Sequence, residues 1–104
     1  MKRALLACLM LAACVTPQGH QAFRQVMERQ IGKQTEEPDF YPVYYRLRQV
    51  ESKTLPNGNV EDEYLTGRRN ECHVFFEATP GTRRVVRWRF EGDERYCVIL
   101  PRER

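Results

Sequence analysis

Three kinds of side chain in this sequence could support a reaction: its cysteines, its two histidines and its single serine. A serine nucleophile needs a base beside it, and no base stands near Ser52 in the sequence. A cysteine nucleophile would require Cys72 or Cys97 to stay reduced, and the histidine that activates the thiol would be His73 or His20. Because these two cysteines are expected to be oxidised, for the reasons given below, the sequence predicts no catalytic residue and a protein that is not an enzyme.

Residues that often bind metals are also present, but their spacing does not suit a site. Cys72 and His73 are neighbours on an expected strand, so their side chains point to opposite faces. The acidic run Glu61, Asp62 and Glu63 lacks the loop spacing of a calcium site. The sequence therefore predicts neither a metal ion nor a cofactor.

Arginine and aromatic side chains share one face of the expected sheet. His73 and Phe75 alternate with core residues on one strand, and Arg87 and Arg89 do so on the next. Phe75, Arg87 and Arg89 form a candidate partner surface, because aromatic residues and arginine are enriched where proteins bind each other. The same face could bind a small ligand, a glycan or lipopolysaccharide phosphates. The even charge balance favours the alternative of a solvated face with salt bridges, for example to Glu77.

Length and charge limit the chain to one small, nearly neutral domain. The 104 residues suffice for a single domain with a modest core. The formal net charge is +3 and includes Lys2 and Arg3 at the N-terminus. Removing these two from the 17 basic residues leaves 15 against 14 acidic ones, a net charge of +1. This balance argues against a nucleic-acid-binding protein.

The N-terminus has the pattern of an export signal. A basic start at residues 1–3 is followed by an apolar run at residues 4–13. A membrane-spanning helix needs about twenty apolar residues, so this run is too short to remain as an anchor. Its proportions are those of a secretory signal peptide, which is removed from the mature protein.

Residues 11–14, Leu-Ala-Ala-Cys, resemble the lipobox of bacterial lipoproteins. In that family cleavage precedes the cysteine, which receives a diacylglycerol on its sulfur and an acyl group on its new amino terminus. The resemblance implies a signal peptide at residues 1–13, lipid attachment at Cys14 and a tether over residues 14–19. Val15 follows the cysteine, and in the family's sorting pattern a residue other than aspartate favours the outer membrane. Attachment by several acyl chains would be stable.

Export also defines the role of the remaining cysteines. Cys8 would leave with the signal peptide and Cys14 would be acylated, so Cys72 and Cys97 are the pair that remains. In an oxidising compartment an isolated pair is most simply a disulfide. This bond would span 25 residues and staple a domain that has little core.

The domain, residues 20–104, is predicted to open with a helix. Apolar residues form one stripe from His20 to Ile31, and Gly32 stands where a C-terminal cap is common. Residues 33–42 are polar and include two prolines. This composition indicates an irregular connector, pinned by Phe40 and Tyr41.

The rest of the chain alternates with the period of a β-strand. Strands are expected over residues 43–52, 60–65, 71–78, 84–91 and 96–100. Residues 55–58, Leu-Pro-Asn-Gly, predict a three-residue hairpin loop with a bulge. That loop sets Lys53 opposite Glu61. Residues 67–70 form the next expected turn.

The third and fourth strands each have one apolar face. Placing both on one side of the sheet sets Val74 opposite Trp88 and Phe76 opposite Val86, which requires an odd number of loop residues. The last strand is expected alongside the Trp88 strand. If the sheet twists, or if this strand crosses one end, Cys97 can reach its partner.

The predicted fold is therefore α+β: one N-terminal helix packed on an antiparallel meander of four or five strands, with one disulfide. This plan is similar to the SmpA/OmlA family of small outer-membrane lipoproteins. The matching residues are Phe23, Ile31, Gly32, Asn57, Gly58, Cys72, Phe76, Trp88, Arg89, Phe90, Glu91, Gly92 and Cys97. The chain has one N-terminal helix where that family has two. The resemblance therefore implies a fold class and an envelope location, and it does not carry over a role in barrel assembly.

These features together predict a lipid-anchored envelope protein that faces the periplasm. We expect a non-enzymatic adaptor or stabilising subunit whose partner is another envelope protein. The alternative is a module that binds a small ligand or glycan, or acts as an inhibitor, through the face formed by Phe75, Arg87 and Arg89.

Overall fold

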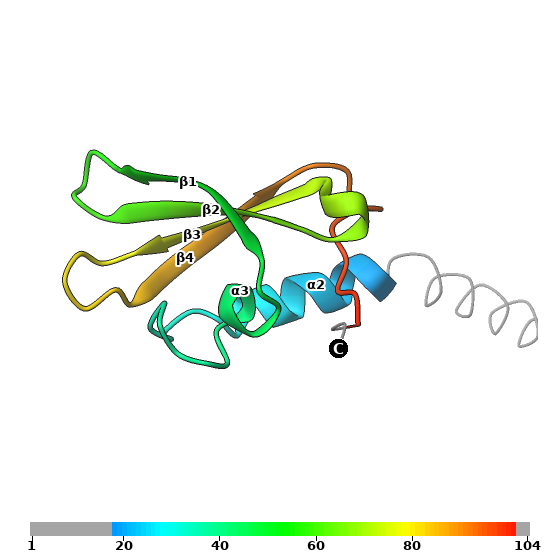
Figure 1. Ribbon diagram of the computed structural model, residues 1–104, viewed down its shortest axis with the longest axis horizontal. Coiled ribbons are helices and arrows are strands. Elements are labelled where there is room, and N and C mark those ends of the chain that lie inside the picture. Colours follow the sequence, from blue (N-terminus) through cyan, green and yellow to red (C-terminus); the bar gives the residue numbers. More distant parts are fainter. Residues whose placement is uncertain (1–17, 102–104) are drawn as a thin grey trace, which may run out of the picture.

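The structure, a computed structural model, describes residues 18–101. Its elements in chain order are α2 (Gln18–Glu28), α3 (Tyr41–Tyr44), β1 (Arg48–Thr54), β2 (Val60–Thr66), the 3-10 helix η1 (Arg68–Asn70), β3 (Cys72–Ala78) and β4 (Val85–Glu91). The strands form one antiparallel sheet in the order β1-β2-β3-β4, and α2 runs along one face of it (Figure 1). This confirms the predicted α+β meander, with four strands. The predicted signal peptide and Cys14 lie outside the described residues.

The apolar stripe of α2 holds the helix to the sheet. Phe23 and Met27 are fully buried. The Phe23 ring meets Trp88 and Phe90 edge-on, at centroid distances of 6.2 and 6.0 Å. Such aromatic pairs stabilise a core beyond the area that they bury. Trp88 Nε1 also donates a hydrogen bond to Glu28 Oε1 (2.9 Å), which fixes the helix end to β4.

The helix begins two residues before its predicted start and ends three residues before its predicted end. At the start, Gly19 is helical and not part of a tether. At the end, the buried Gln30 leaves the helix and its Oε1 accepts the N–H of Tyr41 (2.9 Å). Gly32 then turns with φ +94° and donates its N–H to the carbonyl of Val85 (2.8 Å). Its partner is thus the sheet and not the last turn of the helix.

The connector is irregular as predicted, and its end is anchored in the core. Phe40 is fully buried and meets Phe76 edge-on at a centroid distance of 5.0 Å, and Tyr41 is 3% exposed. The strand predicted from residue 43 begins at Arg48 instead. Residues 41–44 form α3, because a proline in its first turn has the backbone angle that a helix needs.

The β1–β2 hairpin has the predicted turn and the predicted register beside it, and the register shifts farther along, between Gln49 and Glu51. Gly58 adopts φ +91° and donates its N–H to the carbonyl of Leu55 (2.9 Å). Glycine is favoured there because side chains disfavour positive φ. Lys53 lies opposite Glu61, as predicted.

The predicted β3–β4 register is wrong by two residues. Phe76 lies opposite Trp88, and Val74 lies opposite Phe90. The register shifts beside Ala78, where a bulge reverses the alternation of β4, so that Val85 is buried and Val86 is 36% exposed. A bulge adds one residue to a strand and moves its side chains to the other face. The backbone bond from Thr79 N–H to the Arg84 carbonyl (3.0 Å) leaves an even, four-residue loop between them.

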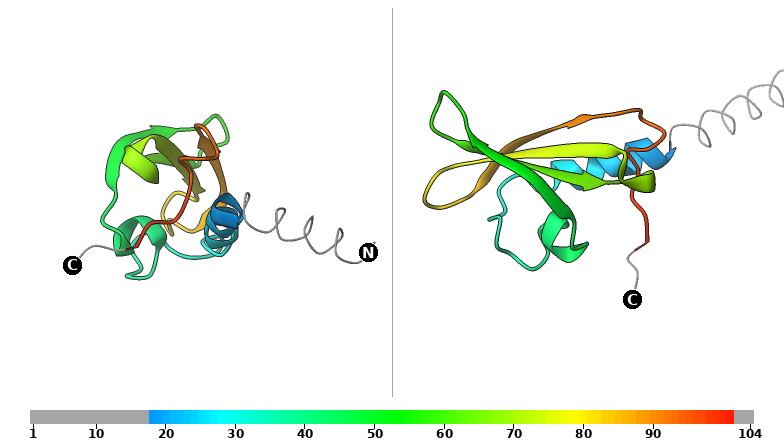
Figure 2. Two further views of the ribbon diagram at one scale, coloured as in Figure 1. Left: turned by 90° about the vertical axis from the view of Figure 1, so that its right-hand side faces the viewer. Right: turned by 45° about the horizontal axis from the view of Figure 1, so that its top comes forward.

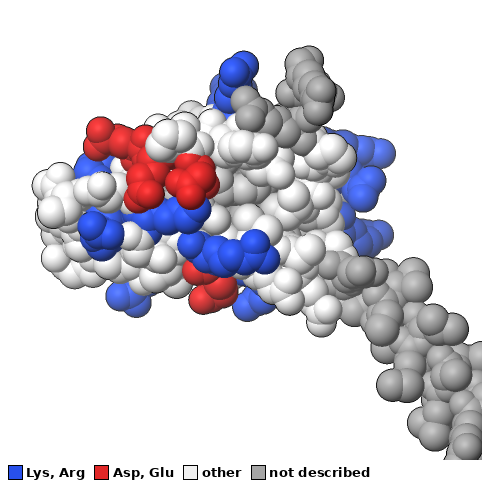
Figure 3. Space-filling model, turned by 90° about the horizontal axis from the view of Figure 1, so that it is seen from below, with Lys and Arg blue, Asp and Glu red and all other residues white. Residues whose placement is uncertain are grey.

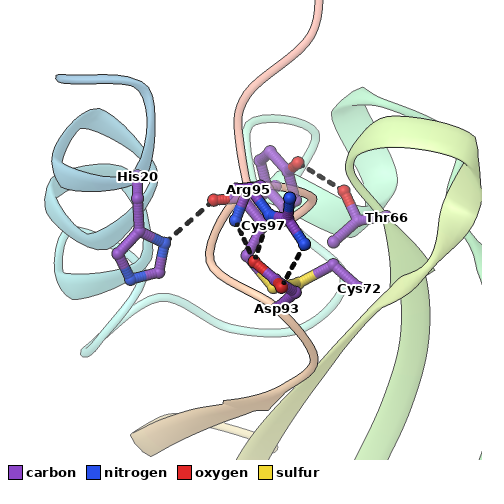
Figure 4. The surroundings of a disulfide bond; sticks show 7 residues. His20, Thr66, Cys72, Asp93, Arg95 and Cys97 are labelled. Atoms are coloured by element: carbon purple, nitrogen blue, oxygen red, sulfur yellow. Dashed lines mark hydrogen bonds and ion pairs between the residues drawn. A yellow bond between two sulfur atoms is a disulfide. The ribbon is translucent and has the colours of Figure 1, made fainter. Parts of the chain in front are cut away.

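The C-terminal segment crosses one end of the sheet and does not form the predicted fifth strand. Figure 2 shows it passing between η1 and the start of α2 on its way to the C-terminus. The Tyr96 carbonyl accepts the N–H of Arg68 (2.8 Å). The Cys97 carbonyl accepts a hydrogen bond from His20 Nδ1 (3.0 Å; Figure 4). These two bonds tie the segment to η1 and to the start of α2.

The Cys72–Cys97 disulfide confirms the predicted pairing. Its S–S distance is 2.10 Å, its Cα atoms are 5.0 Å apart, and both residues are fully buried. Cys72 begins β3 and belongs to the core cluster, so the bond attaches the crossing segment to the sheet itself (Figure 4).

The disulfide should contribute much of the stability of this domain. We expect the double variant Cys72→Ala/Cys97→Ala to lower the free energy of unfolding by about 3 to 4 kcal/mol, because it frees a 25-residue loop in the unfolded chain. Urea unfolding followed by Trp88 fluorescence measures this change. A reductant should destabilise the natural chain and leave the double variant unchanged. Equal sensitivity of the two proteins to the reductant would contradict this role.

Gly67 allows the closest approach between η1 and the crossing segment. It adopts φ +78°, and an added Cβ would lie 2.0 Å from the Tyr96 carbonyl oxygen. Gly81 is a matched control, with φ +82° and no atom within 4 Å of an added Cβ. We expect Gly81→Ala to cost about 1 to 2 kcal/mol of unfolding free energy from its backbone alone, and Gly67→Ala to cost clearly more. Equal losses in urea unfolding would show that the contact is unimportant.

Candidate functional site

The predicted partner surface lies on the outer face of the sheet, the face away from α2. The structure brings Phe75, Arg87 and Arg89 together there, on the adjacent strands β3 and β4. Arg89 covers the ring of Phe75, with Cζ 3.7 Å from the ring centroid. Phe75 is consequently only 6% exposed. The aromatic part of the predicted surface is therefore largely hidden beneath the arginine.

Arg89 is held by two carboxylates. Its Nε and Nη2 donate to the two oxygens of Glu61, each at 3.0 Å, and its Nη1 donates to Glu91 (2.8 Å). The hydrogen bonds that Arg89 donates to Glu61 are the main reason that the pKa of Arg89 lies above its usual value, since they favour the charged form. Glu61 is 8% exposed, so this bidentate pair satisfies a nearly buried charge.

Arg87 is more open than Arg89. Its Nε lies 3.0 Å from Glu77 Oε1, and its side chain is 69% exposed. Glu77 is also bonded by the side-chain amides of Asn59 (2.7 Å) and Asn57 (3.0 Å). These amide donors, that of Asn59 first, hold the pKa of Glu77 below its usual value. The carboxylate is therefore well stabilised without Arg87.

His73 completes the outer face by pairing with Glu63. Its Nδ1 lies 2.5 Å from Glu63 Oε2. Acidic residues of β2 and β3 thus oppose the basic residues of β3 and β4 across the whole face. The geometry is that of a salt-bridged sheet surface, from which Arg87 extends farthest into solvent.

The side chains considered for catalysis are engaged in structural contacts. Ser52 Oγ donates to Asp62 Oδ1 (2.6 Å). His20 Nδ1 must carry the proton in its bond to the Cys97 carbonyl, because that oxygen can only accept. Its Nε2 is buried and has no hydrogen-bond partner in the described part of the chain. Cys72 and Cys97 hold no free thiol, since they form the disulfide.

The acidic run on β2 is divided between the two faces of the sheet. Glu61 and Glu63 point outward to Arg89 and His73. Asp62 points to the inner face, where its Oδ2 accepts a hydrogen bond from Arg83 Nη2 (3.0 Å). The three carboxylates cannot converge on one ion. Among residues 18–101 no group of three or more acidic, histidine or cysteine side chains could hold a metal.

A cavity on the inner face was not predicted from the sequence. It has a volume of about 490 Å³ beside α3, the connector and the first two strands. Its lining residues are Thr35, Glu36, Pro42, Val43, Leu47, Gln49, Tyr64 and Arg83. One signal could have indicated the basic residue in its lining: Asp62 occupies a core-facing position in the alternation of β2, and its buried carboxylate requires a partner, which is Arg83.

No known protein family, curated protein or solved structure matches this chain. The helices within residues 18–101 are all too short or too polar to cross a membrane.

The two outer-face arginines should differ in their effect on stability. We expect Arg89→Ala to lower the free energy of unfolding by about 1 to 3 kcal/mol, because Glu61 would lose two hydrogen bonds in a nearly buried position. Arg87→Ala should cost less than about 1 kcal/mol, since Arg87 is exposed and Glu77 keeps its amide donors. Urea unfolding of both variants measures the difference. The opposite order would refute this assignment.

Proposed function

We propose that the protein is a lipid-anchored envelope lipoprotein that faces the periplasm from the outer membrane. The observation that carries the proposal is the N-terminal sequence: a basic start, a short apolar run and Leu-Ala-Ala-Cys at residues 11–14. A disulfide-linked domain follows, which suits an oxidising compartment.

The start of α2 limits how far the domain could stand from such an anchor. Four residue steps separate Cys14 from Gln18, where the helix begins. Even a fully extended chain spans only about 14 Å over four residues. The domain would therefore work close to the membrane surface, where tethering raises the effective concentration of weakly binding partners.

The role that we propose is that of a non-enzymatic adaptor or stabilising subunit of an envelope complex. Its support comes from the structural engagement of the side chains considered for catalysis, including Ser52, His20 and the two disulfide cysteines. A second candidate is a module that binds a small ligand, a glycan or a target enzyme through the outer face. The exposed guanidinium of Arg87 favours it, whereas Phe75 and Arg89 are largely occupied with each other.

Mass spectrometry of the protein from its native envelope tests the anchor. The expected mass is that of the chain from Cys14 onward, with a diacylglycerol, an N-linked acyl group and two hydrogens fewer for the disulfide. Cys14→Ser should abolish acylation and should also prevent cleavage of the signal peptide. The disulfide should still form. An unprocessed, unacylated natural chain would refute the anchor. Crosslinking in cells tests the adaptor role, and failure to capture any envelope protein would count against it.

A further inference from the structure

Strand β1 has an open edge and no buried side chain. It is the first strand in the sheet order, and all seven of its residues are exposed. Its register with β2 shifts between Gln49 and Glu51, so its regular stretch next to the hairpin is Glu51 to Thr54. Within residues 18–101 no backbone hydrogen bond joins its outer edge to another segment. At the opposite edge of the sheet, the chain at Gly32 and Lys33 exchanges two backbone hydrogen bonds with Val85. An open edge is a template on which another extended chain can add a strand.

The inner-face cavity lies directly beside this open strand. Gln49 of β1 lines it, and Pro42, Val43 and Leu47 supply an apolar wall. Tyr64 also lines it, and burial raises the pKa of this tyrosine to about 12, so its hydroxyl stays neutral. The cavity can therefore receive a side chain that projects from a strand paired with β1.

The charges around the cavity favour a basic side chain. Arg83 lines the cavity, but its charge is balanced by Asp62, which is only 2% exposed. Arg83 Nε is also occupied, because it donates to Thr35 Oγ1 (3.1 Å). Glu36 is exposed and has no ion pair or hydrogen bond among the described residues. One uncompensated carboxylate thus remains at the cavity.

The neighbouring connector strengthens this preference. It carries Glu37 and Asp39 in addition to Glu36, against Lys33 alone. Lys33 is already paired with Asp39 at 2.8 Å. Figure 3 shows a cluster of acidic side chains on the face seen from below, the side on which the connector runs, with lysine and arginine side chains directly beside it. With three acidic residues against one lysine, the connector itself has a net charge of −2, which favours a cation over an anion on its side of the cavity.

We propose that β1 and the adjoining cavity bind an extended segment of a partner protein that carries a lysine or arginine. The backbone of the segment pairs with the outer edge of β1. The aliphatic stem of its basic side chain packs on Pro42, Val43 and Leu47, and its charged end reaches Glu36. The inference deepens the adaptor role proposed above by naming its docking site, although binding itself does not require the lipid anchor.

The test is an NMR titration of the full chain, labelled with ¹⁵N, with synthetic peptides whose two ends are capped. The first peptide is Thr-Val-Lys-Val-Thr, and two others replace its lysine with norleucine or glutamate. We expect the lysine peptide to shift the amide signals of residues 48–54 and of the cavity lining. It should bind about fivefold more tightly than the glutamate peptide, as expected for one partly exposed ion pair.

Two controls separate the backbone contribution from the charge contribution. Methylating the backbone nitrogens of the lysine peptide should abolish binding, because strand addition requires its N–H groups. Glu36→Gln should weaken the lysine peptide about threefold to fivefold and leave the norleucine peptide unchanged. Glu94→Gln removes the same charge from an exposed residue in the turn after β4 and should change neither.

Several outcomes would overturn the proposal. Undiminished binding of the methylated peptide would exclude strand addition. Equal or tighter binding of the norleucine peptide would show an apolar occupant, and shifts caused only by an N-acetylglucosamine dimer would assign the cavity to a glycan. Concentration-dependent broadening of the β1 signals without peptide would assign the edge to a second copy of this chain. These results are distinguishable from failure of the anchor, which the mass of the native protein reports independently.

Discussion

One covalent bond determines how the ends of this small domain meet. The Cys72–Cys97 disulfide joins the first residue of β3 to a segment that otherwise has no strand to pair with. With Cys97 in place, its carbonyl meets His20 on α2 and the neighbouring Tyr96 carbonyl meets Arg68 on η1. The disulfide and these two hydrogen bonds thereby hold the sheet, the helix and the C-terminal segment together at one end of the domain.

Charge pairing shapes the two faces of the sheet differently. On the outer face, carboxylates of β2 and β3 are matched across strands by basic side chains, and Arg89 also covers Phe75. On the inner face, α2 covers the half of the sheet that contains Trp88 and Phe90, through its own Phe23. The other half is less covered, and there the Asp62–Arg83 pair lies beside an open cavity. The outer face is therefore a network of ion pairs between strands, whereas the inner face is only partly covered and contains the cavity beside β1.

The sequence predicted those elements that depend on local chemistry. The Leu55 to Gly58 turn has a proline, an asparagine and a glycine in the positions that a bulged hairpin requires, and the register of β1 with β2 followed from it. The β3–β4 register could not be predicted in this way, because it depends on a bulge beside Ala78. A bulge can form at many positions of an alternating strand at similar cost, so the pattern does not locate it. The candidate outer-face residues were brought together as predicted, but the depth at which Phe75 lies under Arg89 depends on that same register.

By itself, the sequence determined the fold class and the order of a helix followed by strands, because periodicity and turn residues act over a few neighbours. It also determined the pairing of the two domain cysteines, because only Cys72 and Cys97 follow residue 14. It also contains the N-terminal pattern on which the proposed location rests. Only the tertiary structure decided that residues 41–44 form a helix, that the C-terminal segment crosses the sheet end and that a cavity opens beside β1. Each of these depends on contacts between residues far apart in the chain, such as Gln30 with Tyr41 and Asp62 with Arg83, which no local pattern specifies.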